Sequence, residues 1–258
     1  MKKSTLIVII SLIVAIILFI SGVMLDGLTE LKNAYHQDDL NISLPFVKTK
    51  DVKRQFENIK NLDIEASTGN FEIVEYSGDI IEIKAENISR RTEVYQDDET
   101  LVFKENFRFG FPIVNDTDVK IYVPKDYRFN KVEIEIDAAS VKLANLIADE
   151  LEVDVDAGSF KADNITVEKA VVDVDAGEAK IDLLDSKKSE FNVDVGDIKV
   201  VMTGTESDYS YDVDCDLGDI QVGSYRGEGL SDEYYYNGGD RMIEADCNVG
   251  NIIIKMEV

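Results

Sequence analysis

The sequence has little of the chemistry that hydrolases and nucleic-acid-binding proteins rely on. Its 258 residues include one histidine, His36, and no tryptophan. Because His36 lies in a polar stretch far from any glycine-rich turn, the usual base of Ser-His or Cys-His nucleophilic catalysis is missing. Basic residues are scarce as well: 27 Lys and Arg stand against 52 Asp and Glu, which gives a formal charge of −25. We therefore expect neither a catalytic triad nor binding to nucleic acid.

Acidic residues are concentrated in the second half of the chain. Residues 132–258 contain 10 basic and 31 acidic residues, whereas residues 1–131 contain 17 and 21. Hydrophobic residues make up 45% of the sequence, which is enough material for a packed core.

The N-terminal region has the pattern of a membrane anchor. Residues 5–25 (TLIVIISLIVAIILFISGVML) form an uncharged run of 21 residues that follows Lys2 and Lys3. As a helix this run is about 30 Å long, which matches the hydrocarbon thickness of a bilayer. The lysines place the N-terminus in the cytoplasm and everything after Asp26 outside, so we expect residues 1–25 to be a retained single-pass anchor in the cell membrane. A cleaved signal peptide is the alternative, although the run exceeds the usual apolar length and no Ala-x-Ala site follows it.

A polar region of mixed charge follows at residues 26–57. It contains Pro45 and a basic cluster of Lys48, Lys50, Lys53 and Arg54. We interpret it as a solvated linker, with contact between the cluster and anionic lipid head groups as the alternative. A β-strand-repeat domain is then expected over residues 58–258.

From residue 132 onward the sequence repeats a short motif. Copies such as LEVDVDAGSFKA (151–162) and AVVDVDAGEAKI (170–181) share a glycine, which we number position 0. The first three intervals between copies are 19 residues each, an insertion at 224–241 lengthens the last, and an early copy at 61–74 is centred on Gly69. Self-similarity at a fixed period is typical of repeat architectures. The residues at position 0 in the regular region (132–258) are Ala139, Gly158, Gly177, Gly196, Gly218 and Gly250.

Each copy alternates strictly between apolar and polar residues. Positions −5, −3 and −1 are apolar, as are +2 and +4, which predicts strands with one buried face. We expect the glycine to provide a corner with positive φ. Two geometries fit: a coil of a β-solenoid stacked in parallel on the next coil, or an antiparallel hairpin. The fixed spacing favours the solenoid, while Asp at −2 facing Lys at +3 favours the hairpin.

The stretch VKIYVPKDYRFNKVEIEIDAASVKL (119–143), with the serial DxGxxK and LGDIQV units after it, resembles the bacterial putative-adhesin proteins of β-strand repeats, also called toastrack domains. The resemblance covers approximately residues 58–258. It implies an all-β, right-handed solenoid-like domain on the cell surface, commonly behind one membrane helix and often encoded near envelope-stress or transcriptional regulators. It carries over no catalytic residues. The tyrosine-rich insertion and Ala139 at a glycine position depart from the plain repeat.

Two rows of acidic residues follow the repeat, at positions −2 and −4. Because they alternate with the buried positions, they lie on one outward face, where stacked like charges repel. Carboxylate oxygens at this density suit Ca²⁺. A solvated acidic face is the interpretation that we prefer, and no other cofactor is expected. The candidate metal ligands are Asp154, Asp156, Asp173, Asp175, Asp214 and Asp216.

The two cysteines and the insertion are the remaining candidates. Cys215 and Cys247 share position −3, where three other copies have Val155, Val174 and Val193, so they are either buried thiols or a disulfide between stacked coils. The aromatic residues of the insertion are candidates for contact with a partner, although covering the exposed core of the last coil is the preferred interpretation. These residues are Tyr225, Tyr234, Tyr235 and Tyr236.

Together these features predict a membrane-anchored, extracytoplasmic, adhesin-like binding or envelope-sensing module without catalytic activity. The membrane is an expected partner through the N-terminal helix, and the resemblance implies envelope-stress or other membrane proteins as further partners. One alternative is a β-helical enzyme acting on polysaccharides, which would show isolated charged residues breaking the rows. The other is a cation-binding structural surface protein.

Overall fold

The computed structural model describes residues 49–105 and 117–257. The chain divides into the units Met1–Phe46 and Val47–Val258, and all described residues belong to the second unit. The predicted anchor at 1–25 therefore lies outside the described residues. Within the described part, no helix has the length and apolar character needed to cross a membrane.

The described residues are almost entirely β-strand, as the alternating pattern predicts. The strands are β1 (Thr49–Phe56), β2 (Asn61–Ala66), β3 (Asn70–Tyr76), β4 (Ile81–Ser89), β5 (Glu93–Asp97), β6 (Thr100–Lys104), β7 (Asp118–Pro124), β8 (Arg128–Ile136), β9 (Ser140–Val155), β10 (Ser159–Val174), β11 (Glu178–Thr203), β12 (Tyr209–Val222), β13 (Tyr225–Tyr236) and β14 (Arg241–Glu257). A short 3₁₀ turn, Glu206–Asp208, precedes β12.

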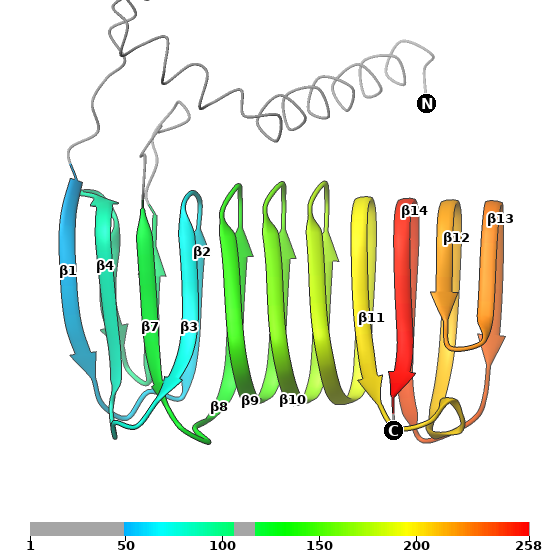
Figure 1. The fold of residues 1–258 in the computed structure, drawn as a ribbon, viewed down its shortest axis with the longest axis horizontal. Coiled ribbons are helices and arrows are strands. Elements are labelled where there is room, and N and C mark those ends of the chain that lie inside the picture. Colours follow the sequence, from blue (N-terminus) through cyan, green and yellow to red (C-terminus); the bar gives the residue numbers. More distant parts are fainter. Residues whose placement is uncertain (1–48, 106–116, 258) are drawn as a thin grey trace, which may run out of the picture. The chain divides into compact units, whose positions relative to one another are not determined.

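These strands form one sheet that folds back on itself into two layers. One path through it runs β1-β4-β7-β3-β9-β10-β11-β14-β12-β13, while β2, β5, β6 and β8 pair off this path. We call layer A the layer that holds β3 and the first halves of β9 and β10, and layer B the layer that holds β2, β8 and the second halves of β9 and β10. In Figure 1 the strands stand side by side, with the two layers one behind the other.

Successive coils of the regular repeats pair in parallel and in register. Ser159 of β10 pairs with Ser140 of β9 and with Glu178 of β11, each 19 positions away. The hairpin alternative is therefore wrong for these repeats, because it requires antiparallel neighbours. Antiparallel pairs occur towards the ends of the sheet, at β1–β4, β4–β7, β5–β6 and β12–β13.

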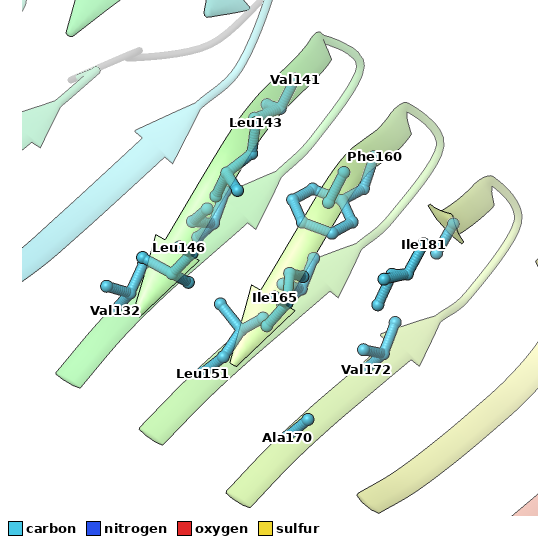
Figure 2. Packing of buried hydrophobic residues seen from close by; sticks show 14 of the residues in the cluster. Val132, Val141, Leu143, Leu146, Leu151, Phe160, Ile165, Ala170, Val172 and Ile181 are labelled. Atoms are coloured by element: carbon cyan, nitrogen blue, oxygen red, sulfur yellow. The ribbon is translucent and has the colours of Figure 1, made fainter. Parts of the chain in front are cut away.

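The hydrophobic core fills the space between layers A and B. Alternate residues along each strand point inward, as Figure 2 shows for Val141 and Leu143 of β9 and for Phe160 and Ile165 of β10. None of these four side chains is more than 2% exposed. Since equivalent residues of neighbouring coils stack on one another, each copy must keep an apolar side chain at its inward positions.

Position −1 does not follow the predicted burial, although positions −5, −3, +2 and +4 do. Val195 is half-buried, and Leu217 and Val249 are 48% and 44% exposed. The chain turns from layer B into layer A around the glycine, so position −1 lies on the corner and not on the inner face of a strand.

The corner glycines are needed for space and not, as predicted, for positive φ. Of the residues at position 0, only Gly69 in the early copy has a positive φ, 99°. A Cβ atom on Gly177 would lie 2.5 Å from the carbonyl oxygen of Gly158 and 2.6 Å from Cγ1 of Val155. Each glycine of the regular repeats packs on the backbone of a neighbouring corner in the stack, which leaves no room for a methyl group. Ala139 packs instead on the corner of Gly69, where the backbone differs, and its side chain is buried.

The chain order breaks at the C-terminal end of the sheet. β14, the last strand in the sequence, lies between β11 and β12 and pairs in parallel with both. Figure 1 shows it in red between yellow β11 and orange β12. Gly250 pairs with both Gly196 and Gly218, so the repeat register is kept although the copies do not stack in chain order. The expectation that each copy stacks on the next one in the sequence is wrong here, because β12 and β13 lie beyond the gap that β14 fills.

The opposite end of the sheet begins inside the stretch that the sequence assigns to the linker. β1 pairs with β4 and forms the edge of layer A. Lys50 and Arg54 of the basic cluster donate hydrogen bonds to the carbonyl oxygens of Thr92 (2.6 Å) and Val94 (2.5 Å). These two side chains therefore belong to the folded domain, where they bridge β1 to the region of β5.

Candidate functional site: the acidic face and the C-terminal junction

The outward surface of layer B carries three adjacent rows of carboxylates, which we call the acidic face. Because the inward positions of layer B are apolar, the residues at −2, −4 and −6 of each coil point to solvent, and the parallel register places equivalent residues side by side. Its members are Asp63, Glu133, Glu152, Glu190, Glu244 and Asp212 at −6, Glu65, Glu135, Asp154, Asp173, Asp246 and Asp214 at −4, and Asp137, Asp156, Asp175, Asp194 and Asp216 at −2. Asn192 and Asn248 interrupt the rows and donate hydrogen bonds to Asp173 (2.5 Å) and Asp194 (2.6 Å).

Carboxylates on neighbouring coils raise one another's pKa. The pKa of Asp154 is raised by partial burial and then by the charges of Asp156 and Asp175. The pKa of Asp246 is raised by the same burial effect and then by Asp214, among others. Repulsion therefore persists in the folded protein and favours a positively charged species at this surface.

The basic side chains of the described region leave most of the acidic face uncompensated. On layer B, Lys131 bridges Glu133 (2.9 Å) and Glu152 (2.8 Å), Lys188 pairs with Glu244 (2.9 Å), and Lys104 pairs with Glu65. The +3 lysines lie on the outward face of layer A, where Lys199 contacts Glu178 (3.3 Å). Within the described residues, no Lys or Arg nitrogen lies within 4.0 Å of an aspartate at position −2 or −4.

The six predicted metal ligands do not form one group. Asp154 and Asp156 lie on the coil beside Asp173 and Asp175, whereas Asp214 and Asp216 lie on β12, beyond β11 and β14. In the part of the chain that the structure describes, no three or more His, Cys, Asp or Glu side chains are placed to hold one metal ion. Calcium binding therefore stays a prediction without a defined oxygen cage.

The insertion at 224–241 contains the edge strand β13, which covers the last coil. The rings of Tyr225 and Tyr234 stack with centroids 4.0 Å apart, and the ring centroids of Tyr211 of β12 and Tyr236 are 4.8 Å apart. Tyr225 and Tyr236 pack against the core, as the capping interpretation predicts. Tyr235 is 63% exposed and is the tyrosine of this group most available to a partner.

Arg241 anchors the first residue of β14 to its neighbours, a role that the sequence did not reveal. It donates hydrogen bonds to the carbonyl oxygens of Ser186 (2.7 Å) and Thr203 (3.1 Å) and forms an ion pair with Asp185. Its guanidinium carbon lies 4.7 Å from the ring centroid of Tyr209. One side chain thus ties β14 to β11 on one side and to β12 on the other.

The two cysteines meet at the same junction. Cys247 of β14 is the register partner of Cys215 of β12 and of Val193 of β11. Both side chains are buried, and the structure holds them as thiols. Burial, followed by the neighbouring Cys215, raises the pKa of Cys247 to about 12.

Glu105 is a buried carboxylate that the sequence pattern does not mark. It accepts hydrogen bonds from the backbone N–H groups of Ser67 (2.9 Å) and Thr68 (3.3 Å) at the corner of the early copy. Burial raises its pKa to about 7, and the two hydrogen bonds oppose that shift. Its burial depends on a corner 38 residues away, so the local sequence contains no signal for it.

Comparison with known proteins places this arrangement in a family. The family model described as Toastrack DUF4097 matches residues 59–229. The chain belongs to the Toastrack DUF4097 family. The match confirms the resemblance seen in the repeat motifs, and it ends before β14, so the inserted strand of this toastrack protein lies outside the matched residues.

Solved structures similar to this toastrack chain include two proteins from bacteria. One is a putative cell adhesion protein from Clostridium sporogenes ATCC 15579, with 14% identity and a TM-score of 0.46 over 81% of this chain and 100% of that chain. The other is a putative adhesin from Bacteroides fragilis NCTC 9343, with 14% identity and a TM-score of 0.45 over 81% of this chain and 98% of that chain. No curated protein matches the chain significantly.

Proposed function

We propose that this toastrack protein is a non-catalytic binding module, held on the outer side of the cell membrane by residues 5–25, whose acidic face binds a positively charged polypeptide. The observation that carries the proposal is the register of layer B, which aligns carboxylates of successive coils into adjacent rows on one surface. Charge complementarity selects a basic partner.

The electrostatics of the acidic face support this role. The pKa of Asp173 is raised mainly by burial and further by neighbouring carboxylates, even though Asn192 donates a hydrogen bond to it. A bound cationic segment would relieve that repulsion without any movement of the sheet. Binding should therefore weaken at acidic pH, where these carboxylates take up protons, and at high salt, where the charges are screened.

The repetition of the charged positions favours binding over catalysis. A polysaccharide-acting β-helical enzyme is expected to break its rows with isolated catalytic side chains. Here Asp at −2 and Lys at +3 recur in copy after copy, as expected of an extended surface.

We also infer right-handed coiling, because crossover connections between parallel strands of one sheet are almost always right-handed.

A binding measurement on the full chain in detergent tests the acidic face. We expect a fluorescent peptide of about 20 lysines to bind with a steep salt dependence, and a glutamate peptide of equal length not to bind. A variant with four neutral substitutions on the acidic face should bind the lysine peptide at least about tenfold more weakly. Its substitutions are Asp154→Asn, Asp156→Asn, Asp173→Asn and Asp175→Asn.

A matched variant on layer A serves as the control for net charge. It removes four acids from the outward surface of layer A and should bind the lysine peptide nearly as well as the unmodified protein. Equal losses in both variants would mean that only net charge matters and that the acidic face is not a binding surface. The control substitutions are Asp163→Asn, Glu178→Gln, Asp182→Asn and Asp197→Asn.

The location is tested separately on intact cells. Protease added outside should remove the domain and leave an N-terminal membrane fragment, because residues 5–25 are proposed to span the membrane with the N-terminus inside. Full protection of the C-terminus would contradict the extracytoplasmic assignment. A mature protein that starts near residue 26 would instead establish cleavage.

A further inference from the structure

The only two cysteines of the chain lie opposite each other at the place where the chain order breaks. We propose that Cys215 and Cys247 are oxidised to a disulfide that fastens the inserted strand β14 to β12. This goes beyond the binding role proposed above and does not depend on the acidic face.

The register supplies the Cα separation that a disulfide needs. Cys215 and Cys247 are direct partners on adjacent parallel strands, and both side chains point into the core. Neighbouring strands lie about 4.8 Å apart, which falls within the range of about 4.4–6.8 Å between Cα atoms that disulfides span. Cys215 is also among the groups that raise the pKa of Cys247, as expected of two neighbouring thiols.

The composition of this row singles out the junction. Position −3 is filled by Val155, Val174 and Val193 in the preceding coils, so the packing accepts an apolar side chain of that size. Cysteine replaces it only in β12 and β14, which are neighbours in space although 32 positions apart in the sequence. Burial alone requires only a small apolar side chain at these two positions, whereas a bond between them requires that both be cysteine.

A covalent link at this point has a structural purpose. β14 is the last strand among the described residues and fills the gap between β11 and β12, where Ile243, Ile252 and Ile254 are fully buried. If β14 left, both neighbours would lose a strand partner and the core would be opened. Backbone pairing and Arg241 hold β14 without a covalent bond, and a disulfide would prevent its release altogether.

The reaction needs a two-electron oxidant, for which a small-molecule disulfide such as oxidised glutathione suffices. The thiolate of one cysteine attacks this disulfide and releases one reduced thiol, and the second cysteine then attacks the mixed disulfide and releases the other. The protein loses two protons and two electrons, and the oxidant is reduced to two thiols. Since both cysteines are buried in the folded state, the exchange takes place before β14 has docked completely.

The test uses the full chain in detergent, unfolded in guanidinium and refolded either with a glutathione redox buffer or with dithiothreitol. Alkylation under denaturing conditions should label two cysteines in the reduced sample and none in the oxidised sample. Before alkylation, the mass of the oxidised protein should be about 2 Da lower than that of the reduced protein. Peptide mapping should recover one intramolecular link. The Tm of the oxidised protein should be higher by about 10 °C, because the bond closes a loop of roughly thirty residues in the unfolded chain.

Two variants separate the disulfide from simple packing. Cys247→Val introduces the residue found at this position in β11, so the reduced Tm should be nearly unchanged while the effect of oxidation disappears. In the second variant, Cys215→Val is combined with Val193→Cys, which moves the partner of Cys247 from β12 to β11. If register decides the pairing, this variant should regain the oxidation-dependent rise in Tm.

Three results would overturn the proposal: two alkylated cysteines after oxidative refolding, a disulfide that joins two chains, or equal Tm values for oxidised and reduced protein. None of these results bears on the acidic face. Conversely, failure of the lysine-peptide experiment leaves this disulfide unaffected.

Discussion

Replacing Gly177 by alanine tests whether the coils are held apart by the absence of a side chain at each corner. The added Cβ would lie 2.5 Å from the carbonyl oxygen of Gly158 and 2.6 Å from Cγ1 of Val155. The first contact is with backbone of the preceding coil, which cannot rotate away as the end of a flexible side chain could. We therefore expect the two coils to separate locally and the corner hydrogen bond from Glu178 N–H to the Gly158 oxygen, 3.2 Å long, to weaken.

The magnitude follows from two opposing effects. Overpacking of this kind costs about 1–3 kcal/mol. Replacing glycine also lowers the conformational entropy of the unfolded chain, which raises the free energy of unfolding by about 0.4–1 kcal/mol. The net loss is on the order of 1–2 kcal/mol, which lowers the Tm of a domain of this size by about 3–8 °C.

Thermal unfolding of the full chain, followed by circular dichroism, measures this effect, with Ala139→Gly as the reciprocal change. Ala139 has the same position in its coil, yet its methyl group is accommodated and buried. Its removal should destabilise the protein, so a methyl group helps at 139 and harms at 177. Adding Val155→Ala to Gly177→Ala should give less than additive loss, since one of the two close contacts is then gone. An unchanged or raised Tm for Gly177→Ala would refute the close stacking of corners.

Three further predictions concern pH, the C-terminal junction and calcium. The folded pKa of Glu105 is raised from 4.5 to about 7, so this residue contributes stability that is fully present below pH 4.5 and is lost as pH rises through 7. Glu105→Gln should remove this pH-dependent loss, which is on the order of 3 kcal/mol, when the free energy of unfolding in guanidinium is compared at pH 5 and pH 7.5. An unaltered pH dependence in the variant would contradict the prediction. Arg241→Lys should cost about 2 kcal/mol and speed amide hydrogen exchange at the start of β14, because an ammonium group has three donors and cannot serve the four acceptor atoms that the guanidinium fork reaches. Unchanged exchange would exclude an anchoring role. Millimolar Ca²⁺ should raise the Tm slightly, and sodium chloride at matched ionic strength should reproduce most of that rise. A metal site would be established if Ca²⁺ raised the Tm by several degrees more than the salt control and the double variant Asp173→Asn with Asp175→Asn abolished this excess.

Much of the fold could be predicted because the local alternation of apolar and polar residues determines which segments form strands. Val153 and Val155 are buried while Asp154 and Asp156 face solvent, since successive side chains of a strand point to opposite sides. The acidic face follows from the same rule once equivalent residues stack. The covering role of the tyrosine-rich insertion also follows, because the last coil of a repeat protein needs a cover.

Tertiary structure alone decided which coils are neighbours at the C-terminal end of the sheet and what each corner needs. The copies carry the same pattern, so the free edges of β11 and β12 can both accept a strand such as β14, and nothing in its own residues indicates that it fills the gap between them. Glu105 is buried by a corner distant in the sequence, and the corner glycines are required by the backbone of the preceding coil. A periodic sequence determines the direction of each side chain, but it contains the same information at every step and therefore cannot specify the order in which its copies stack.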